Sequence, residues 1–568
     1  SRFGSRVMSS LNFPHPEASN SRNMMRPRTE SFNPHAPENQ IIIQSHESRW
    51  SWLLCCLCWL GCDGFRCLGC ANLSRRGRRT EENSEEAPDY PHVKKELALL
   101  SAAYTNHPHS PGCCAWVRGL RKLAKRVQDE DAADASAQAG QNRMEPLNAT
   151  SGNHAAVFLF PPPGSTEQEP KRERLRDSAI VAAHFAQFAL ACYGTKMYGF
   201  IVPCGCFCPN ACAFSCMSGV AKRDIIKSQR TAGPFKPVWW LSIDKCSKSV
   251  VLSVRGTFGA NDLLADVFAR EITVGNHKVH YGVYVCALWV YRKVYHELDK
   301  LEVNGKTARV LINGEDFKLV IVGHSLGGAV AALVAAMLRD PREMPREVPA
   351  EVETSRSFFG GANGRRPSEP RELPSEPREF PAYCFTYGAP KVVDANLAQK
   401  MRRYILSIVH NKDMFPRMCH QSMKNLRDQI SAMEVENVPL PRSVVDKKCL
   451  SGPGRILYIR RLKRDCLARL PGCILRRGTL AHYDFYLAEP RHAQDGEDDV
   501  RVTHFQELRF AYSMWSDHFP QTYQYVCEAL SDRLRFPTSS SCCGGRRPQP
   551  QEIVDAFESV TRDFAERS

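Results

Sequence analysis

Residues 317–338, FKLVIVGHSLGGAVAALVAAML, constrain the fold more than any other stretch of the chain. Leu319 to Val322 is a short apolar run rich in β-branched residues, which predicts a buried strand of a parallel sheet. A glycine-rich turn follows it. From Ala329 to Leu338 the chain is apolar and contains neither glycine nor proline, which predicts a helix. The stretch therefore predicts a strand, a sharp turn and a helix in direct succession.

The turn reads Gly323-His324-Ser325-Leu326-Gly327, a G-x-S-x-G pattern. Glycine on both sides of the serine leaves room for a strained backbone that lifts the hydroxyl off the end of the sheet. The first N–H groups of the helix then point at whatever binds there. Five residues of this kind also occur by chance as a glycine-rich turn with an idle serine. Placement between a buried strand and a small-residue helix favours a nucleophile elbow.

Further strand and helix patterns follow one another along the chain, which predicts a mostly parallel α/β sheet covered by helices on both faces. In such sheets the functional residues lie at the carboxyl ends of the strands. The expected strands are 238–243, 250–254, 383–387, 404–410 and 456–459, and the expected helices include 178–193, 282–301 and 522–530.

The chain of 568 residues has room for one large domain with extensions. We expect a disordered N-terminus over 1–90, a helical and linker region over 91–170, the α/β domain over 171–535 and a polar C-terminal tail over 536–568. Within the domain, residues 341–381 form a low-complexity insert in which Pro-Ser-Glu-Pro-Arg-Glu occurs twice. Such a sequence cannot bury a core and is expected to be a disordered surface excursion.

A block of tryptophans, leucines and cysteines at 50–73 interrupts the polar N-terminal region. It is too short to span a bilayer. Its thiols and the basic run at 75–79 favour a membrane anchor with S-acylation at Cys55, Cys56, Cys58 and Cys62. A cysteine-rich metal knot and the remnant of a lost transmembrane region are the alternatives.

A second cluster of cysteines lies in the uncharged region between Met197 and Ala221. Its spacing is not the paired C-x-x-C of a zinc ribbon, so no metal ligands are assigned. An apolar lid or membrane loop, buried packing and a metal site all stay open for it. The five thiols are those of Cys204, Cys206, Cys208, Cys212 and Cys216.

The net charge of +15 suits an anionic surface. No nucleic-acid-binding signature accompanies it, so a membrane surface is the preferred partner, with an ordinary basic solvated surface as the alternative. The 24 cysteines are clustered rather than spread as a disulfide framework, and no secretory signal is visible. We therefore expect free thiols and a membrane-associated, cytosol-facing protein. The oligomeric state cannot be predicted.

A serine hydroxyl needs a general base to take its proton, and the base in turn needs a carboxylate to hold its tautomer. In folds with this turn the chain order is Ser, then Asp, then His. Asp413 fits the acid because it follows directly on a buried strand downstream of Ser325. Asp394 is the rival, further past its own strand.

Five histidines follow the acid, and the pattern favours the last because it opens the final predicted helix. The side chain of His324 is expected to point away from the nucleophile and to shape the turn. The five candidates are His420, His482, His492, His504 and His518.

The oxyanion of an acyl-transfer intermediate needs preorganised donors. The N–H of Leu326, directly after the nucleophile, is one. Thr257, in the Arg255-Gly256-Thr257 segment that ends an earlier strand, offers the second through its N–H and its hydroxyl.

Six segments resemble, in order, the blocks of the class 3 (fungal-type) lipase family. The resemblance covers about Ser178 to Leu530, and the segment TAGPFKPVWWLSIDK is most similar to the sn-1-specific diacylglycerol lipases. It implies an α/β-hydrolase fold with Ser325 as nucleophile, Asp413 as acid and His518 as base, and with Thr257 and Leu326 in the oxyanion hole. The six segments are VLSVRGTFGANDLLADV, HYG, VGHSLGG, CFTYGAP, VHNKDMFPR and DHFPQTY.

The resemblance implies a membrane lipase that hydrolyses the sn-1 ester of diacylglycerol to monoacylglycerol and a fatty acid. A triacylglycerol lipase, a phospholipase A1 and an inactive membrane scaffold are the alternatives. The chemistry needs no cofactor; the family implies calcium, but the sequence has no D-x-D-x-D-G loop. The family also has four transmembrane helices before its catalytic domain and a regulatory insert that lies after the acid. Here only the 50–73 block precedes the domain, and the repeats follow the nucleophile helix.

Overall fold

A computed structural model describes most of the expected α/β region, together with one helix before it and one after it. The described residues are 119, 121–129, 169–201, 209–233, 235–256, 271–298, 310–312, 315–344, 379–432, 450–461, 483–488, 508, 511, 513–535 and 547–566.

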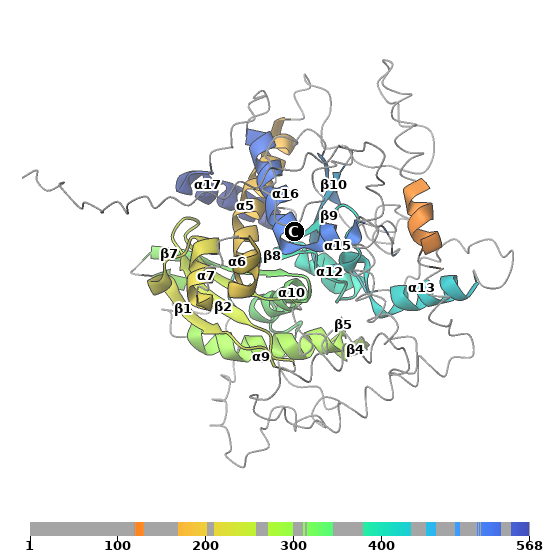
Figure 1. Cartoon of the computed structure of the whole chain (residues 1–568). Coiled ribbons are helices and arrows are strands. Elements are labelled where there is room, and N and C mark those ends of the chain that lie inside the picture. The colour runs from red at the N-terminus through yellow and green to blue at the C-terminus, as the bar shows by residue number, and fades with distance from the viewer. Residues whose placement is uncertain are drawn as a thin grey trace, which may run out of the picture. The chain divides into compact units, whose positions relative to one another are not determined.

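Nine strands of the described residues form one sheet at the centre of the fold (Figure 1). They are β1 (Ile225–Gln229), β2 (Trp239–Asp244), β3 (Ser249–Val254), β6 (Val310–Ile312), β7 (Glu315–His324), β8 (Ala382–Tyr387), β9 (Ile405–His410), β10 (Arg455–Arg461) and β11 (Tyr483–Ala488). Their order is β1-β2-β3-β7-β8-β9-β10-β11, with β6 paired to β7 off this path. Neighbours from β3 to β10 are parallel, whereas β1, β2, β6 and β11 join antiparallel.

Helices pack on both faces of this sheet (Figure 1). The larger helices are α5 (Glu169–Ala191), α9 (Tyr281–Leu298), α10 (Leu326–Arg339), α13 (His420–Ala432), α16 (Pro520–Arg535) and α17 (Pro550–Glu566), and all of these except α13 contribute to the core clusters on the sheet faces. The shorter helices are α6 (Thr195–Ile201), α7 (Asn210–Ser218), α12 (Ala395–Met401), α15 (Met514–His518) and the 3₁₀ turns η1 (Lys222–Asp224) and η3 (Phe415–Arg417). Residues 121–129 form a further helix, and β4 (Glu271–Val274) and β5 (His277–His280) form a separate hairpin.

The central strand β7 shows why its sequence is apolar without alternation. Leu319 and Ile321 belong to the core cluster formed with α9, α10 and α12. Val320 and Val322 belong to the cluster on the other face, formed with α5, α16 and α17. A strand buried on both faces has no polar side, so its sequence is a continuous apolar run. The mostly parallel sheet, its helices on both faces and the strand–serine–helix turn make this an α/β-hydrolase fold, which confirms the predicted fold class.

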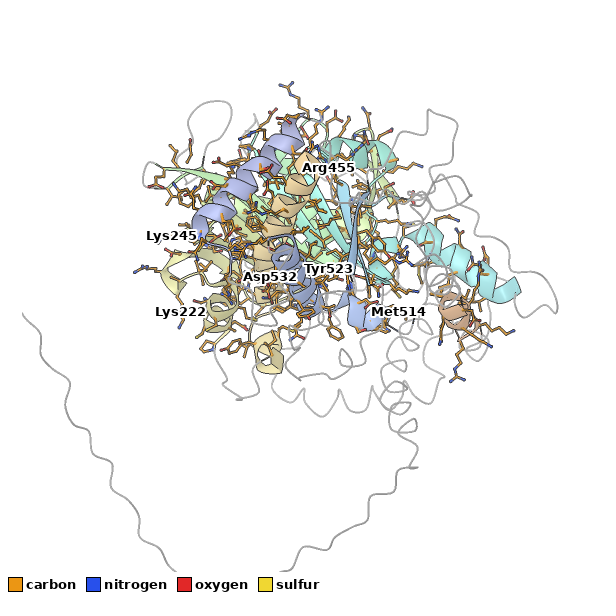
Figure 2. The ribbon with its side chains drawn as sticks, turned by 90° about the horizontal axis from the view of Figure 1, so that it is seen from above. Lys222, Lys245, Arg455, Met514, Tyr523 and Asp532 are labelled. Carbon is orange, nitrogen blue, oxygen red and sulfur yellow. The ribbon has the colours of Figure 1, made fainter. Side chains whose placement is uncertain are left out.

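The C-terminal region differs from the expected polar tail. Residues 550–566 form α17, whose apolar side is buried against α5 and the sheet. Phe557 packs edge-to-face on Phe185 of α5 and lies close to Phe385 of β8. Asp563 accepts a 2.6 Å bond from the buried Arg455 at the start of β10, which is labelled in Figure 2. The helix belongs to the core of the α/β domain because its burial is continuous with that of α5.

The proposed anchor at 50–73, the S-acylation candidates and residues 345–378 of the insert lie outside the described residues. Among those that the structure describes, no helix is long and apolar enough to cross a membrane. Of the clustered cysteines, Cys212 and Cys216 lie on α7, while Cys204, Cys206 and Cys208 lie outside the described residues. The ring of Phe214 on α7 stacks on Trp240 of β2, so the inner side of this helix is part of the packed core.

Candidate active site

Ser325 lies in the sharp turn between β7 and α10, at the carboxyl edge of the parallel strands. Its φ of 59° and ψ of −132° are strained for a residue with a side chain, as a nucleophile elbow requires. A Cβ on Gly323 would meet the backbone of Gly327, and a Cβ on Gly327 would meet the backbone of Val254 in β3. Only glycine fits at both positions, which is why this pattern produces the turn.

The imidazole of His518 faces the serine hydroxyl. His518 is the last residue of α15, and its Nε2 lies 2.9 Å from Oγ of Ser325. Its Nδ1 lies 2.8 Å from Oδ2 of Asp413. A carboxylate can only accept, so Nδ1 carries the proton and Nε2 is free to accept from the serine. The tautomer is therefore the one in which His518 can act as a base.

Asp413 is fully buried, three residues beyond the end of β9. Its Oδ1 accepts from the N–H of Phe415 at 2.9 Å, and its Oδ2 accepts from the hydroxyl of Tyr523 at 2.6 Å as well as from His518. Gly388 lines this cradle at a φ of +64°, and a Cβ there would lie 2.8 Å from Oδ2 of Asp413. The three predicted residues thus meet at one edge of the sheet, although they are far apart in the sequence.

Asp394, the alternative candidate for the acid, lies at the start of a helix and not beside His518. Asp394 caps the N-terminus of α12, where it accepts from the N–H of Leu397 at 2.7 Å. It also accepts from the N–H of Lys278 at 2.7 Å and bonds the ring of the buried His277. Of the other candidate bases, His482, His492 and His504 lie outside the described residues, and His420 begins α13.

The expected oxyanion donors are only partly described. Leu326 is the first residue of α10, so its N–H has no acceptor within the helix. Thr257 lies outside the described residues. Its neighbour Gly256 is described, and a Cβ on Gly256 would lie 3.0 Å from Cβ of Ser325. The end of β3 therefore abuts the nucleophile, where the second donor was expected.

Three residues of the site were not found from the sequence. Tyr523 holds Asp413, and burial together with this neighbouring carboxylate raises the pKa of its phenol well above the usual value. The ring of Phe415 stacks on His518 with centroids 3.7 Å apart. Asp517 accepts from Asn411 and Ser513 at 2.8 Å each and so ties the base to the turn after β9. Tyr523 and Asp517 both lie within five residues of His518, so the available signal was proximity to the predicted base.

The ring of His324 does not point away from the site. Its centroid lies 4.7 Å from that of His518, and its two nitrogens contact the hydroxyl of Tyr193 and the carbonyl of His518. Burial, and secondarily the neighbouring His518, lower the pKa of His324 well below the usual value, which favours a neutral ring.

No group of three or more metal-ligating side chains occurs among the described residues.

Comparison with known proteins finds a family match in the centre of the chain. The family model for lipase (class 3) matches residues 251–360 and 366–423. This segment is similar to class 3 lipases. It includes Ser325 and Asp413, whereas His518 lies beyond it.

Among curated relatives, human diacylglycerol lipase-alpha is 24% identical over 302 residues, which are 46% of this chain and 25% of the relative. Mouse diacylglycerol lipase-beta is 24% identical over 197 residues, 30% of this chain and 28% of the relative. The chain thus spans about a quarter of the length of the curated relatives that it matches.

Among solved structures, the match to the Rhizomucor miehei lipase propeptide complex covers 68% of this chain and 93% of the lipase chain, at 13% sequence identity and a TM-score of 0.31. The match to a mutant of MDLA from Penicillium cyclopium covers 46% of this chain and 77% of the MDLA chain, at 20% sequence identity and a TM-score of 0.28. These TM-scores are low, so the fold assignment above depends on the strand order and the serine turn.

Proposed function

We propose that this chain is a class 3 lipase that hydrolyses a carboxylic ester through Ser325, His518 and Asp413. The carrying observation is the unbroken path from Oγ of Ser325 through both ring nitrogens of His518 to Asp413, with steps of 2.9 and 2.8 Å. Nε2 of His518 takes the hydroxyl proton while Oγ attacks the ester carbonyl carbon. Asp413 then faces the imidazolium at Nδ1 and stabilises its charge.

The tetrahedral intermediate places a negative charge on the former carbonyl oxygen, to which Leu326 and Thr257 are assigned as N–H donors. Nε2 returns its proton to the alcohol oxygen as the C–O bond breaks, which leaves an acyl group on Ser325. Water, activated by the same nitrogen, attacks this ester and releases the fatty acid. One imidazole therefore serves as base and acid in both halves of the reaction.

We assign the substrate to membrane glycerolipids, with the sn-1 ester of diacylglycerol preferred. Two findings support this assignment. The curated relatives are diacylglycerol lipases by name. Phe519, the residue after His518, has a large apolar side chain that is 42% exposed, which suits an enzyme that works at a lipid surface.

The test of the chemistry is labelling with a fluorophosphonate, with Ser325→Ala as the matched control. We expect an adduct on Ser325 in the folded protein and none in the variant. A folded wild-type protein without an adduct would favour the inactive membrane scaffold.

The test of the substrate is turnover of diacylglycerol, triacylglycerol and phosphatidylcholine in the same mixed micelles. We expect the diacylglycerol rate to be the highest and the product to be the monoacylglycerol that lacks the sn-1 chain. Equal rates on all three lipids would remove the diacylglycerol assignment, and a preference for either of the others would replace it with a triacylglycerol lipase or a phospholipase A1.

We further propose a membrane-associated, cytosol-facing location with acyl chains on Cys55, Cys56, Cys58 and Cys62. Thioesters are cleaved by neutral hydroxylamine, so this treatment is expected to release the protein from membranes. Protein that stays on the membrane after treatment would count against acylation as the anchor.

A further inference from the structure

The carbonyl end of α15 is held by two histidine rings. A helix of five residues cannot satisfy its last carbonyls internally, so they need other donors. The carbonyl of Asp517 accepts from Nδ1 of His410 at 3.1 Å, and the carbonyl of His518 accepts from Nε2 of His324 at 2.6 Å. His410 ends β9 and His324 ends β7. The residue that carries the imidazole base is therefore attached through its main chain to the same two strand ends that precede Asp413 and Ser325.

The protonation of the His324 ring follows from its two contacts. A carbonyl can only accept, so Nε2 must carry a proton and donate. Nδ1 then accepts from the hydroxyl of Tyr193 at 2.8 Å when the ring is neutral. Both side chains are buried, and the lowered pKa of His324 is consistent with this neutral form. The carbonyl of His518 thus selects the tautomer, and Tyr193, which follows the last turn of α5, donates to the remaining nitrogen and orients the ring.

We infer that His324, oriented by Tyr193, is a positioning residue that fixes the backbone of His518 above the sheet edge and so keeps Nε2 of His518 within reach of Ser325. Phe415 stacks on the His518 ring and sets its plane, whereas the bonds to the carbonyls of α15 set the place of its main chain. The hydrogen bonds of the His324 ring go to the hydroxyl of Tyr193 and to the main chain of His518. The inference rests on the proposed esterase function.

A pair of substitutions at one position tests this. In His324→Gln the side-chain amide nitrogen can take the place of Nε2 and still donate to the carbonyl of His518. In His324→Asn the shorter side chain reaches only the place of Nδ1, so the bond to His518 is lost. Because a displacement of about 1 Å can slow an enzyme about 100-fold, we expect His324→Asn to lower kcat on p-nitrophenyl butyrate by about 10- to 100-fold with KM changed less than about threefold.

Rescue by the longer amide is the discriminating result. His324→Gln is expected to retain most of the activity that His324→Asn loses. Tyr193→Phe, which removes the partner of Nδ1, is expected to lie between them. Equal losses of kcat in the two amide variants would overturn the inference, because a merely structural role would not depend on which ring nitrogen is replaced.

A second buried histidine supplies the control for general destabilisation. His184 of α5 bonds Asp244 at the opposite edge of the sheet, and Lys245, next to Asp244, lies on the other side of Figure 2 from Met514 of α15. His184→Asn is expected to lower the melting temperature without changing the kcat of the folded protein. If it lowers kcat as much as His324→Asn does, position at the active edge is not the cause and the inference fails.

Hydrogen exchange separates this inference from the proposed function. His324→Asn should speed amide exchange in residues 514–519, and His324→Gln should not, whether or not the protein hydrolyses an ester. Absence of hydrolysis and of the Ser325 adduct in the wild-type protein would refute the proposed function. Unchanged amide exchange in His324→Asn would refute the positioning role of His324 and leave the proposed function untouched.

Discussion

Two buried histidine–carboxylate pairs lie at opposite ends of the strands of the same sheet. At one end Nδ1 of His518 lies 2.8 Å from Asp413, and at the other Nε2 of His184 lies 2.6 Å from Asp244. All four side chains are buried. In distance and burial the pairs are nearly alike.

They differ in what surrounds the pair. The second nitrogen of His518 faces the hydroxyl of Ser325, which the strained turn holds in place. The remaining neighbours of Asp244 are the N–H of Cys246 and both the N–H and hydroxyl of Ser247, while the ring of His184 packs edge-on against Phe185 and Phe188. A buried histidine–carboxylate pair is therefore not by itself a catalytic feature. On the proposed function, the serine turn at the carboxyl ends of the strands makes the difference.

Neutralising the first carboxylate is expected to have the largest effect. Asp413→Asn keeps the size of the side chain but removes the charge that faces Nδ1 and no longer enforces the tautomer of His518. We expect kcat to fall by about 1,000- to 10,000-fold, as for the corresponding change in serine proteases. Ester hydrolysis at saturating substrate measures it.

The comparison gives this prediction its control. Asp244→Asn is an identical chemical change at the other end of the strands and should leave the kcat of the folded protein nearly unchanged, because Asp244 bonds His184, Cys246 and Ser247 and no residue of the proposed triad. A similar loss of kcat in both variants would mean that the two pairs are not functionally distinct.

The second pair is expected to matter for stability instead. Replacing the carboxylate weakens the buried bond to His184 and leaves buried polar atoms poorly paired, at a cost of about 1–3 kcal/mol. We therefore expect Asp244→Asn to lower the free energy of unfolding by about this amount. Urea unfolding followed by circular dichroism measures it, and a change below about 0.5 kcal/mol would show that the pair is dispensable.

The sequence predicted those parts of the site that follow local rules. Ser325 lies in a turn whose glycines leave it no other conformation, and Asp413 directly follows a strand that is visibly buried. The same kind of apolar run predicted that the sheet is mostly parallel and buried on both faces. Five histidines follow the acid in the sequence, and their positions relative to the predicted strands do not show which of them is the base. His518 was favoured because it precedes a predicted helix and because of the family resemblance.

What could not be predicted depends on long-range contacts. Tyr523 contacts Asp413, and Phe415 contacts His518, each across about a hundred residues of sequence. Proximity to a predicted residue marks Tyr523 as a neighbour of the site but does not show which side chain it contacts. The helix α17 has a regular apolar spacing at Ile553, Phe557 and Val560, but its partner Phe185 lies at the other end of the domain. An amphipathic pattern shows that a face needs cover and does not show which surface supplies it.

A smaller effect should separate the hydroxyl of Tyr523 from its ring. Tyr523→Phe removes the 2.6 Å bond to Asp413 and keeps the packing of the ring against Tyr387 and His410. A hydrogen bond to a charged group contributes about 1.5–3 kcal/mol, part of which acts on catalysis, so we expect kcat to fall about tenfold. Steady-state kinetics beside Asp413→Asn measures it. A loss as large as that of Asp413→Asn would mean that the tyrosine does more than hold the carboxylate.

The smallest expected effect is a dependence of stability on pH that comes from the second pair. Burial alone would raise the pKa of Asp244, but the charge of His184 and the hydrogen bonds from His184, Ser247 and Cys246 outweigh it and lower this pKa below the ordinary value of 3.8. A carboxyl whose pKa is lowered by folding contributes stability that is fully present above its unfolded pKa and is lost as the pH falls through its folded pKa. The difference in unfolding free energy between wild-type protein and Asp244→Asn should therefore shrink as the pH falls below the ordinary pKa of 3.8. Urea unfolding of both proteins across this acid range measures it, and a difference that grows toward low pH would mean that folding raises the pKa of this carboxyl instead of lowering it.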